Sequence, residues 1–215
     1  MNSVNAEKAV LLAARREMNA AKGSHDWEHT ERVLAMALHI AKKERADLRI
    51  VRLAALLHDI ARSCEDRSGG RTCHAQEGAK RAGKLLRAQG IDEPAVHAVT
   101  HCIETHRFRG QKRPVSKEAK VLYDADKLDS IGAVGIGRAF LFAGEVGAKL
   151  HNKGVDIEKT RAYTKEDTAY REYMVKLRHV KDRMLTKEGR RLARERHAFM
   201  KEFFTRLNRE VTGVL

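Results

Sequence analysis

His58 and Asp59 follow directly on the apolar run from Leu53 to Leu57, so an imidazole and a carboxylate lie side by side at the end of a predicted core helix. Burying either group without a partner is costly, and a shared metal ion would satisfy both. Adjacent residues on a helix point about 100° apart, which roughly suits neighbouring corners of an octahedral site. A surface-facing helix end with a local hydrogen bond is the alternative explanation of the pair.

Two further residues favour the metal site. His29 precedes the pair by 29 positions, in the segment HDWEHTERV, and Asp126 lies in LYDADKLD on a later predicted helix. Three helices would then bring His, His-Asp and Asp to one point. Nitrogen and oxygen donors without a thiolate suit Mn, Fe, Mg, Co or Zn. A second pair, His25-Asp26, sits at a polar helix start, where capping or a place at the rim of the site is the expected role.

The elements that must position these residues are all predicted to be helices. The chain has only two prolines and few β-branched runs, which favours an all-α fold. Asp47 is the predicted N-cap of IVRLAALLHDIAR, which is apolar nearly all round and so reads as the buried core helix. A polar, glycine-rich loop is expected over 63–73. One helix is expected from a cap at Ser24 or Asp26 to about 44. The other helices are expected over 5–22, 74–89, 92–106, 116–130, 131–146, 165–187 and 187–210.

A single domain is predicted over residues 1–215, with a core at about 20–145 and a C-terminal helical extension at about 150–215. No segment approaches the roughly 18 apolar residues that a membrane span needs. The odd count of three cysteines argues against a secreted disulfide framework, so a cytoplasmic protein is expected.

The ordered residues His29, His58-Asp59 and Asp126 resemble the H…HD…D signature of the HD-domain metal-dependent phosphohydrolases. The resemblance covers nearly the whole chain, and it implies that these four residues are metal ligands in a cleft of a compact all-α bundle. It points to a bacterial and archaeal subgroup that includes nucleotide pyrophosphohydrolases acting on nucleoside triphosphates. The segments that resemble the subgroup's motifs are HDWEHTERVLAMALHIA, LAALLHDIA, CHAQEGAKRAGKLL, ETHRF, DADKLDSIGAVGIGRAF and ARERHAFMKEFF.

A metal ion would generate a nucleophilic water near neutral pH, and a nearby carboxylate or histidine would take its proton. His101, Glu104 and His106 are the candidates for this base. Some HD proteins bind two metals through the order H…HD…H…H…D. This chain can fill that order with His74 and His101, so a second metal is an open alternative.

Phosphate groups need cationic partners, and four residues are predicted to supply them. Arg32 lies three positions after His29, and Lys127 adjoins Asp126. Arg138 and Lys176 sit in segments that carry the resemblance. Arg32 and Lys127 are also assigned to the catalytic group. The basic loop with Arg107, Arg109, Lys112 and Arg113 is either a phosphate contact or a solvated loop.

The net charge of +14 indicates an anionic partner. The predicted function is hydrolysis of a nucleotide or another small phosphate ester or anhydride by a metal-activated water. The enzyme alternatives are a two-iron HD oxygenase and a phosphodiesterase. The remaining alternative is a non-catalytic helical protein that binds nucleic acid through the basic C-terminal helices.

Overall fold

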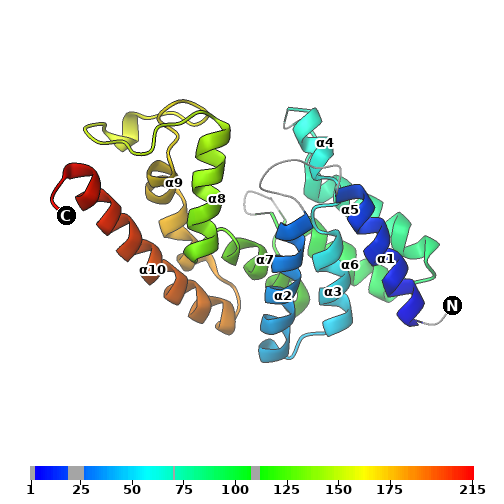
Figure 1. The fold of residues 1–215 in the computed structure, drawn as a ribbon. Coiled ribbons are helices and arrows are strands. Elements are labelled where there is room, and N and C mark those ends of the chain that lie inside the picture. The colour runs from blue at the N-terminus through cyan, green and yellow to red at the C-terminus, as the bar shows by residue number, and fades with distance from the viewer. Residues whose placement is uncertain (1–2, 19–26, 70, 108–111) are drawn as a thin grey trace. The chain divides into compact units, whose positions relative to one another are not determined.

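The computed structural model describes residues 3–18, 27–69, 71–107 and 112–215. These residues form helices and connecting turns without any strand, which confirms the predicted all-α class (Figure 1). The chain divides into two compact units, Met1–Asp126 and Lys127–Leu215. This division falls earlier than the predicted end of the core at about 145, and the single-domain organisation stays a prediction.

The first unit is built around α3 (Leu48–Leu57), which lies against α1 (Ser3–Met18), α2 (Trp27–Glu44) and α6 (Glu93–Thr105). Seven of the ten residues of α3 are buried. Its predicted N-cap is confirmed, because the Asp47 carboxylate accepts from the backbone N–H of Arg49 (2.8 Å) and Ile50 (3.1 Å). The helix ends at Leu57, which leaves His58 and Asp59 in the turn that follows.

α5 (His74–Ala88) packs along α6, and α4 (Arg62–Arg67) lies against α5. The close approach of α5 to α6 uses a glycine, since a Cβ on Gly83 would come within 3.3 Å of Thr100 Cγ2. Asp92 caps α6 by accepting from Ala95 N at 2.9 Å. The remaining helix, α7 (Lys117–Leu128), carries Asp126 near its C-terminal end.

The second unit contains α8 (Gly132–Glu145), the short 3₁₀ helix η1 (Ile157–Lys159), α9 (Ala169–Val175), the 3₁₀ helix η2 (Leu177–Arg183) and α10 (Lys187–Thr212). α10 packs against α8 and η2 (Figure 1). The ring of Phe204 stacks on Tyr173 with centroids 4.4 Å apart. Gly132 has φ +79°, a left-handed conformation that side-chain-bearing residues rarely adopt.

Three predicted segments differ from the structure. The helix expected over IVRLAALLHDIAR ends at Leu57, five residues early. The expected loop over 63–73 contains the helix α4. The expected helix over 165–187 is broken at Lys176, after which the chain continues as η2. A 3₁₀ helix aligns every third residue, and this places Leu177 and Val180 together in the core. α10 then starts afresh because the Thr186 hydroxyl accepts from Gly189 N at 2.9 Å. No helix among the described residues is long and apolar enough to cross a membrane.

Candidate metal centre

Three of the predicted ligands, His29, His58 and Asp126, converge inside the first unit from α2, the turn after α3, and α7. His29 Nε2 lies 3.3 Å from His58 Nε2 and 3.5 Å from Asp126 Oδ1. Both histidines are fully buried, whereas the Asp126 side chain keeps 15 % of its surface exposed. The first donor group therefore has one edge open to solvent.

A second donor group lies beside the first and consists of Asp59, His74 and His106, all buried. His74 Nε2 lies 3.3 Å from His106 Nε2. The Oδ1 atom of Asp59 lies 3.5 Å from the first of these nitrogens and 3.7 Å from the second. The three residues come from the turn after α3, the start of α5 and the end of α6.

The Asp59 carboxylate joins the two groups. Its Oδ2 lies 3.8 Å from His29 Nε2 and 3.8 Å from His58 Nε2, while its Oδ1 faces the second group. A divalent ion with bonds of about 2.1 Å keeps neighbouring donors roughly 3.0 to 3.4 Å apart. The observed spacings of 3.3 to 3.8 Å are close to this range, so the donor sets fit one ion each, with Asp59 shared.

Backbone carbonyls orient two of the imidazoles. His58 Nδ1 donates to Ala55 O at 2.8 Å, and His106 Nδ1 donates to Ile103 O at 2.6 Å. A carbonyl can only accept, so the proton of each neutral ring sits on Nδ1 and the lone pair on Nε2 points at its donor group. This is the arrangement that a metal-binding histidine needs.

The pKa of His58 is lowered to about 4, chiefly by burial; Asp59 and Asp126 oppose this shift, and His29 and His106 add to it. The ring is therefore neutral at neutral pH and can bind a metal ion. The unfolded chain, with an ordinary pKa of 6.5, binds the proton more readily. The stability that this neutral ring contributes is present above pH 6.5 and is lost as the pH falls from 6.5 towards 4.

We expect the metal-free protein to lose up to about 3 kcal/mol of unfolding free energy through His58 alone between pH 7 and pH 4. Urea unfolding of the chelator-treated protein at pH 7, 6 and 5 would measure this loss. An unfolding free energy that stays constant or rises towards pH 5 would contradict it.

Glu65, on α4, holds His74 in position. Its Oε2 accepts from the His74 backbone N–H at 2.9 Å and from His74 Nδ1 at 2.6 Å. Its Oε1 accepts from Arg107 Nη2 at 2.9 Å. Burial tends to raise the pKa of Glu65, but the bonds from His74 and Arg107 outweigh this and lower it. The carboxylate is therefore ionised and directs the His74 Nε2 lone pair at the second group.

Replacing Glu65 with glutamine is expected to weaken metal binding by about 10- to 100-fold, the usual effect of losing a partner of a metal-binding histidine. Isothermal titration with Mn²⁺ would measure the change. Glu77→Gln is the matched control, because Glu77 pairs with Arg81 on α5 and belongs to neither donor group. Equal affinities of the two variants would show that Glu65 does not position His74.

The family model of the HD domain matches residues 26–131, a range that includes both donor groups. YpgQ from Bacillus subtilis is 38 % identical over 194 residues, which are 88 % of this chain and 86 % of that protein. The chain belongs to the HD-domain family.

Solved structures of the HD family agree with this. The crystal structure of B. subtilis YpgQ in complex with ADP has a TM-score of 0.76 at 33 % identity and covers 98 % of this chain and 97 % of its own. A predicted HD superfamily hydrolase from an uncultured Thermotogales bacterium has a TM-score of 0.67 at 31 % identity, over 94 % and 91 % of the two chains. An HD-superfamily hydrolase from Bacillus thuringiensis has a TM-score of 0.77 at 26 % identity, over 99 % of each chain. These relatives support a hydrolase.

The predicted second-metal set is wrong in one residue, because His106 and not His101 lies beside His74. The two histidines are five positions apart, so they point about 140° away from each other on a helix. His101 Nε2 instead accepts from Val115 N at 3.3 Å, on the other side of α6. The sequence predicts His106 only as a base. Its position five residues after His101 does not by itself show which of the two histidines faces the metal donors.

Glu104 and the nearby loop lie outside the two donor groups. Glu104 Oε1 pairs with Lys112 Nζ at 2.6 Å, and Arg107 contacts Glu65 and the Cys73 sulfur. Two other candidates, Arg109 and the pair His25-Asp26, fall outside the described residues. Arg107 of this loop therefore contacts Glu65, the residue that holds His74 in position. The sequence does not predict this role.

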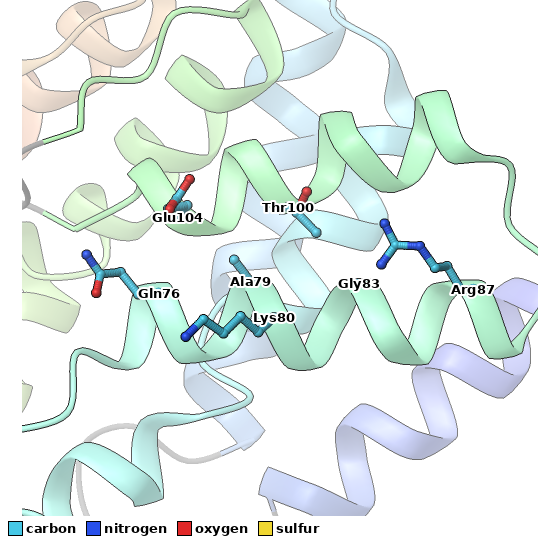
Figure 2. Close-up of a pocket in the computed structure, with 7 residues that line it drawn as sticks. All are labelled: Gln76, Ala79, Lys80, Gly83, Arg87, Thr100 and Glu104. Carbon is cyan, nitrogen blue, oxygen red and sulfur yellow. The ribbon is translucent and has the colours of Figure 1, made fainter.

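A groove of about 300 Å³ runs between α5 and α6 (Figure 2), and it contains none of the six donor residues. Figure 2 shows that Ala79 and Gly83 come from one of the two helices, and Thr100 and Glu104 from the other. Glu104 therefore faces this groove and not the metal donors. Its lining residues are Gln76, Ala79, Lys80, Gly83, Arg87, Thr100 and Glu104.

The four predicted phosphate contacts are all in described helices or at their ends. The half-buried Arg32 lies one turn along α2 from His29, with Nη1 3.9 Å from Glu28 Oε2. Lys127 follows Asp126 in α7 and is half-buried. Arg138 Nη1 donates to Asp129 Oδ2 at 2.7 Å, and Lys176 pairs with Glu172 at the end of α9. Their contacts with substrate stay predictions.

Proposed function

We propose that the protein is a divalent-metal-dependent phosphohydrolase that acts on a nucleotide or another small phosphate ester or anhydride. The observation that carries this proposal is the pair of buried donor groups that share the Asp59 carboxylate. The six residues bring four imidazoles and two carboxylates together, and this combination of nitrogen and oxygen donors suits divalent ions. The crystal structure of the relative YpgQ with ADP supports a nucleotide as ligand.

We further propose two ions per chain. His29, His58 and Asp126 would hold one, His74 and His106 the other, and Asp59 both. Four of the six residues are histidines, which favours Mn, Fe, Co or Zn over Mg, because Mg prefers carboxylate, carbonyl and water oxygens. When bound, such ions lower the pKa of a coordinated water and neutralise phosphate charge.

The chain's own residues supply the rest of the chemistry. The carbonyls of Ala55 and Ile103 keep the protons of His58 and His106 away from the donor groups. Arg32, one helical turn after His29, and Lys127, next to Asp126, would bind phosphate oxygens. A guanidinium binds two oxygens in a fork, and an ammonium acts as a point charge. His101 and Glu104 are not part of this proposal, because they bond to Val115 and Lys112.

Metal analysis followed by a substrate screen tests the function. We expect about two divalent ions per chain after reconstitution with Mn²⁺, and metal-dependent release of phosphate from a panel of nucleoside mono-, di- and triphosphates. Pyrophosphate as product would identify cleavage between the α and β phosphates, and orthophosphate would identify terminal or monoester cleavage. A protein that binds no divalent ion after reconstitution with Mn, Fe, Co and Zn would refute the proposal.

The shared carboxylate between two histidine-containing groups also favours a second candidate, a two-iron oxygenase. Iron content and oxygen consumption separate the two functions. A protein purified with two irons that consumes oxygen with an organic substrate, and that leaves nucleotides intact, would favour the oxygenase.

A further inference from the structure

The positive charge of the second unit is concentrated in one segment. Residues 176–209 contain 12 Lys and Arg against 4 Asp and Glu, whereas the rest of that unit contains 8 of each. This segment comprises η2 and most of α10. The surplus charge is therefore a property of two adjacent helices and not of the whole surface.

Three cations of α10 lie on one exposed face. Lys187, Arg194 and Lys201 are spaced seven residues apart, so they share a face and follow each other at about 10 Å along the helix axis. Arg209 lies eight residues beyond Lys201 and within about 40° of Lys187 around the helix axis. Among the described residues, none of these four side chains forms an ion pair. We call this row the basic stripe; it is about 33 Å long.

The acidic residues of α10 are mostly held by other arginines. Arg191 pairs with Glu188 at 2.8 Å and with Glu195 at 3.2 Å, and Arg206 pairs with Glu210 at 2.7 Å. These ion pairs hold the three carboxylates beside the stripe, where they pair with arginines that do not belong to it. The charges of the stripe itself therefore stay available to an external anion.

η2 adds to the same positive field. It packs against α10 and carries Arg178, Lys181 and Arg183. The pKa of His197 on α10 is lowered, by burial first and then by Lys181 on η2 and Lys201 on the stripe, while Asp182 opposes them. Cations from both helices are therefore close enough to His197 to lower its pKa.

We propose that the basic stripe and η2 form a binding surface for the phosphate backbone of single-stranded nucleic acid. Cations about 10 Å apart can each contact a different phosphate of one flexible strand, because even a stacked strand has one phosphate per roughly 3.4 Å of its axis. A strand of a duplex makes a full turn within about 34 Å and would wind away from a straight row of this length. A flexible single strand can follow the row. The stripe contains no aromatic side chain for base stacking, so binding would be independent of base sequence.

Fluorescence anisotropy with a labelled 20-nucleotide single-stranded RNA tests this surface on the full chain. If four cations each neutralise one phosphate, the logarithm of the affinity should fall with the logarithm of salt at a slope of about −3. The triple variant Lys187→Glu, Arg194→Glu, Lys201→Glu should bind at least about tenfold more weakly in low salt. A matched control reverses three exposed lysines of the charge-balanced part of the unit: Lys149→Glu, Lys159→Glu and Lys165→Glu.

The control variant carries the same change in net charge but leaves the basic stripe intact, so it should keep most of the affinity. Equal losses of affinity in the two variants would show that binding depends only on overall charge, and this would overturn the proposal. A duplex of the same length that binds as tightly would overturn the choice of a single strand. Polyglutamate that competes as well as RNA would instead assign the surface to an acidic protein. Thermal unfolding of both variants checks that each one folds.

Discussion

Asp59→Asn is expected to lower hydrolysis of the nucleotide substrate at least about a thousandfold and to reduce bound metal sharply. Asp59 presents one carboxylate oxygen to each donor group. An asparagine amide has only one oxygen, so it cannot serve both groups at once. The metal contribution to such reactions is worth several kcal/mol, and about 4 kcal/mol corresponds to three powers of ten in rate. Elemental analysis and steady-state kinetics measure the two effects.

Asp47→Asn is the control for this substitution. Asparagine is as good an N-cap as aspartate, so α3 should stay intact, and Asp47 lies outside both donor groups. Circular dichroism should give the same helix content for both variants. An Asp59→Asn protein that keeps full metal content and full activity would show that the carboxylate is not a ligand.

His106→Gln is expected to reduce bound metal from about two ions per chain to about one and to remove most of the activity. His106 is buried, and its Nε2 lies 3.3 Å from His74 Nε2. Glutamine cannot reproduce an imidazole nitrogen held by the Ile103 carbonyl. The second group would then keep only His74 and a share of Asp59, which is too few ligands for stable binding.

The comparison with His101→Gln makes this result specific. His101 lies on the same helix but bonds to Val115 N, so its replacement should leave the metal content at about two. The reverse pattern, with metal lost from the His101 variant and kept in the His106 variant, would refute the second donor group. If the wild-type protein binds one ion and His106→Gln does not change this metal content, only the first donor group binds metal.

Local sequence alone determined much of the first unit. The apolar run around α3 and the Asp47 cap predicted the buried helix, because helix propensity, capping and burial all depend on residues that are close in sequence. The positions of His29, His58 and Asp126 within predicted helices also indicated that they could meet. Their spacing of 3.3 to 3.5 Å in the structure agrees with that prediction.

Tertiary structure alone decided which polar residues complete the centre. His101 and His106 look alike in sequence, but the packing of α6 against α3 and α5 turns only His106 inwards. Glu65 reaches His74 because the segment expected as a loop folds into α4 against α5. The break at Lys176 likewise follows from burying Leu177 and Val180. Helical periodicity states which residues share a face, but the direction that each face takes depends on packing between residues that are distant in sequence.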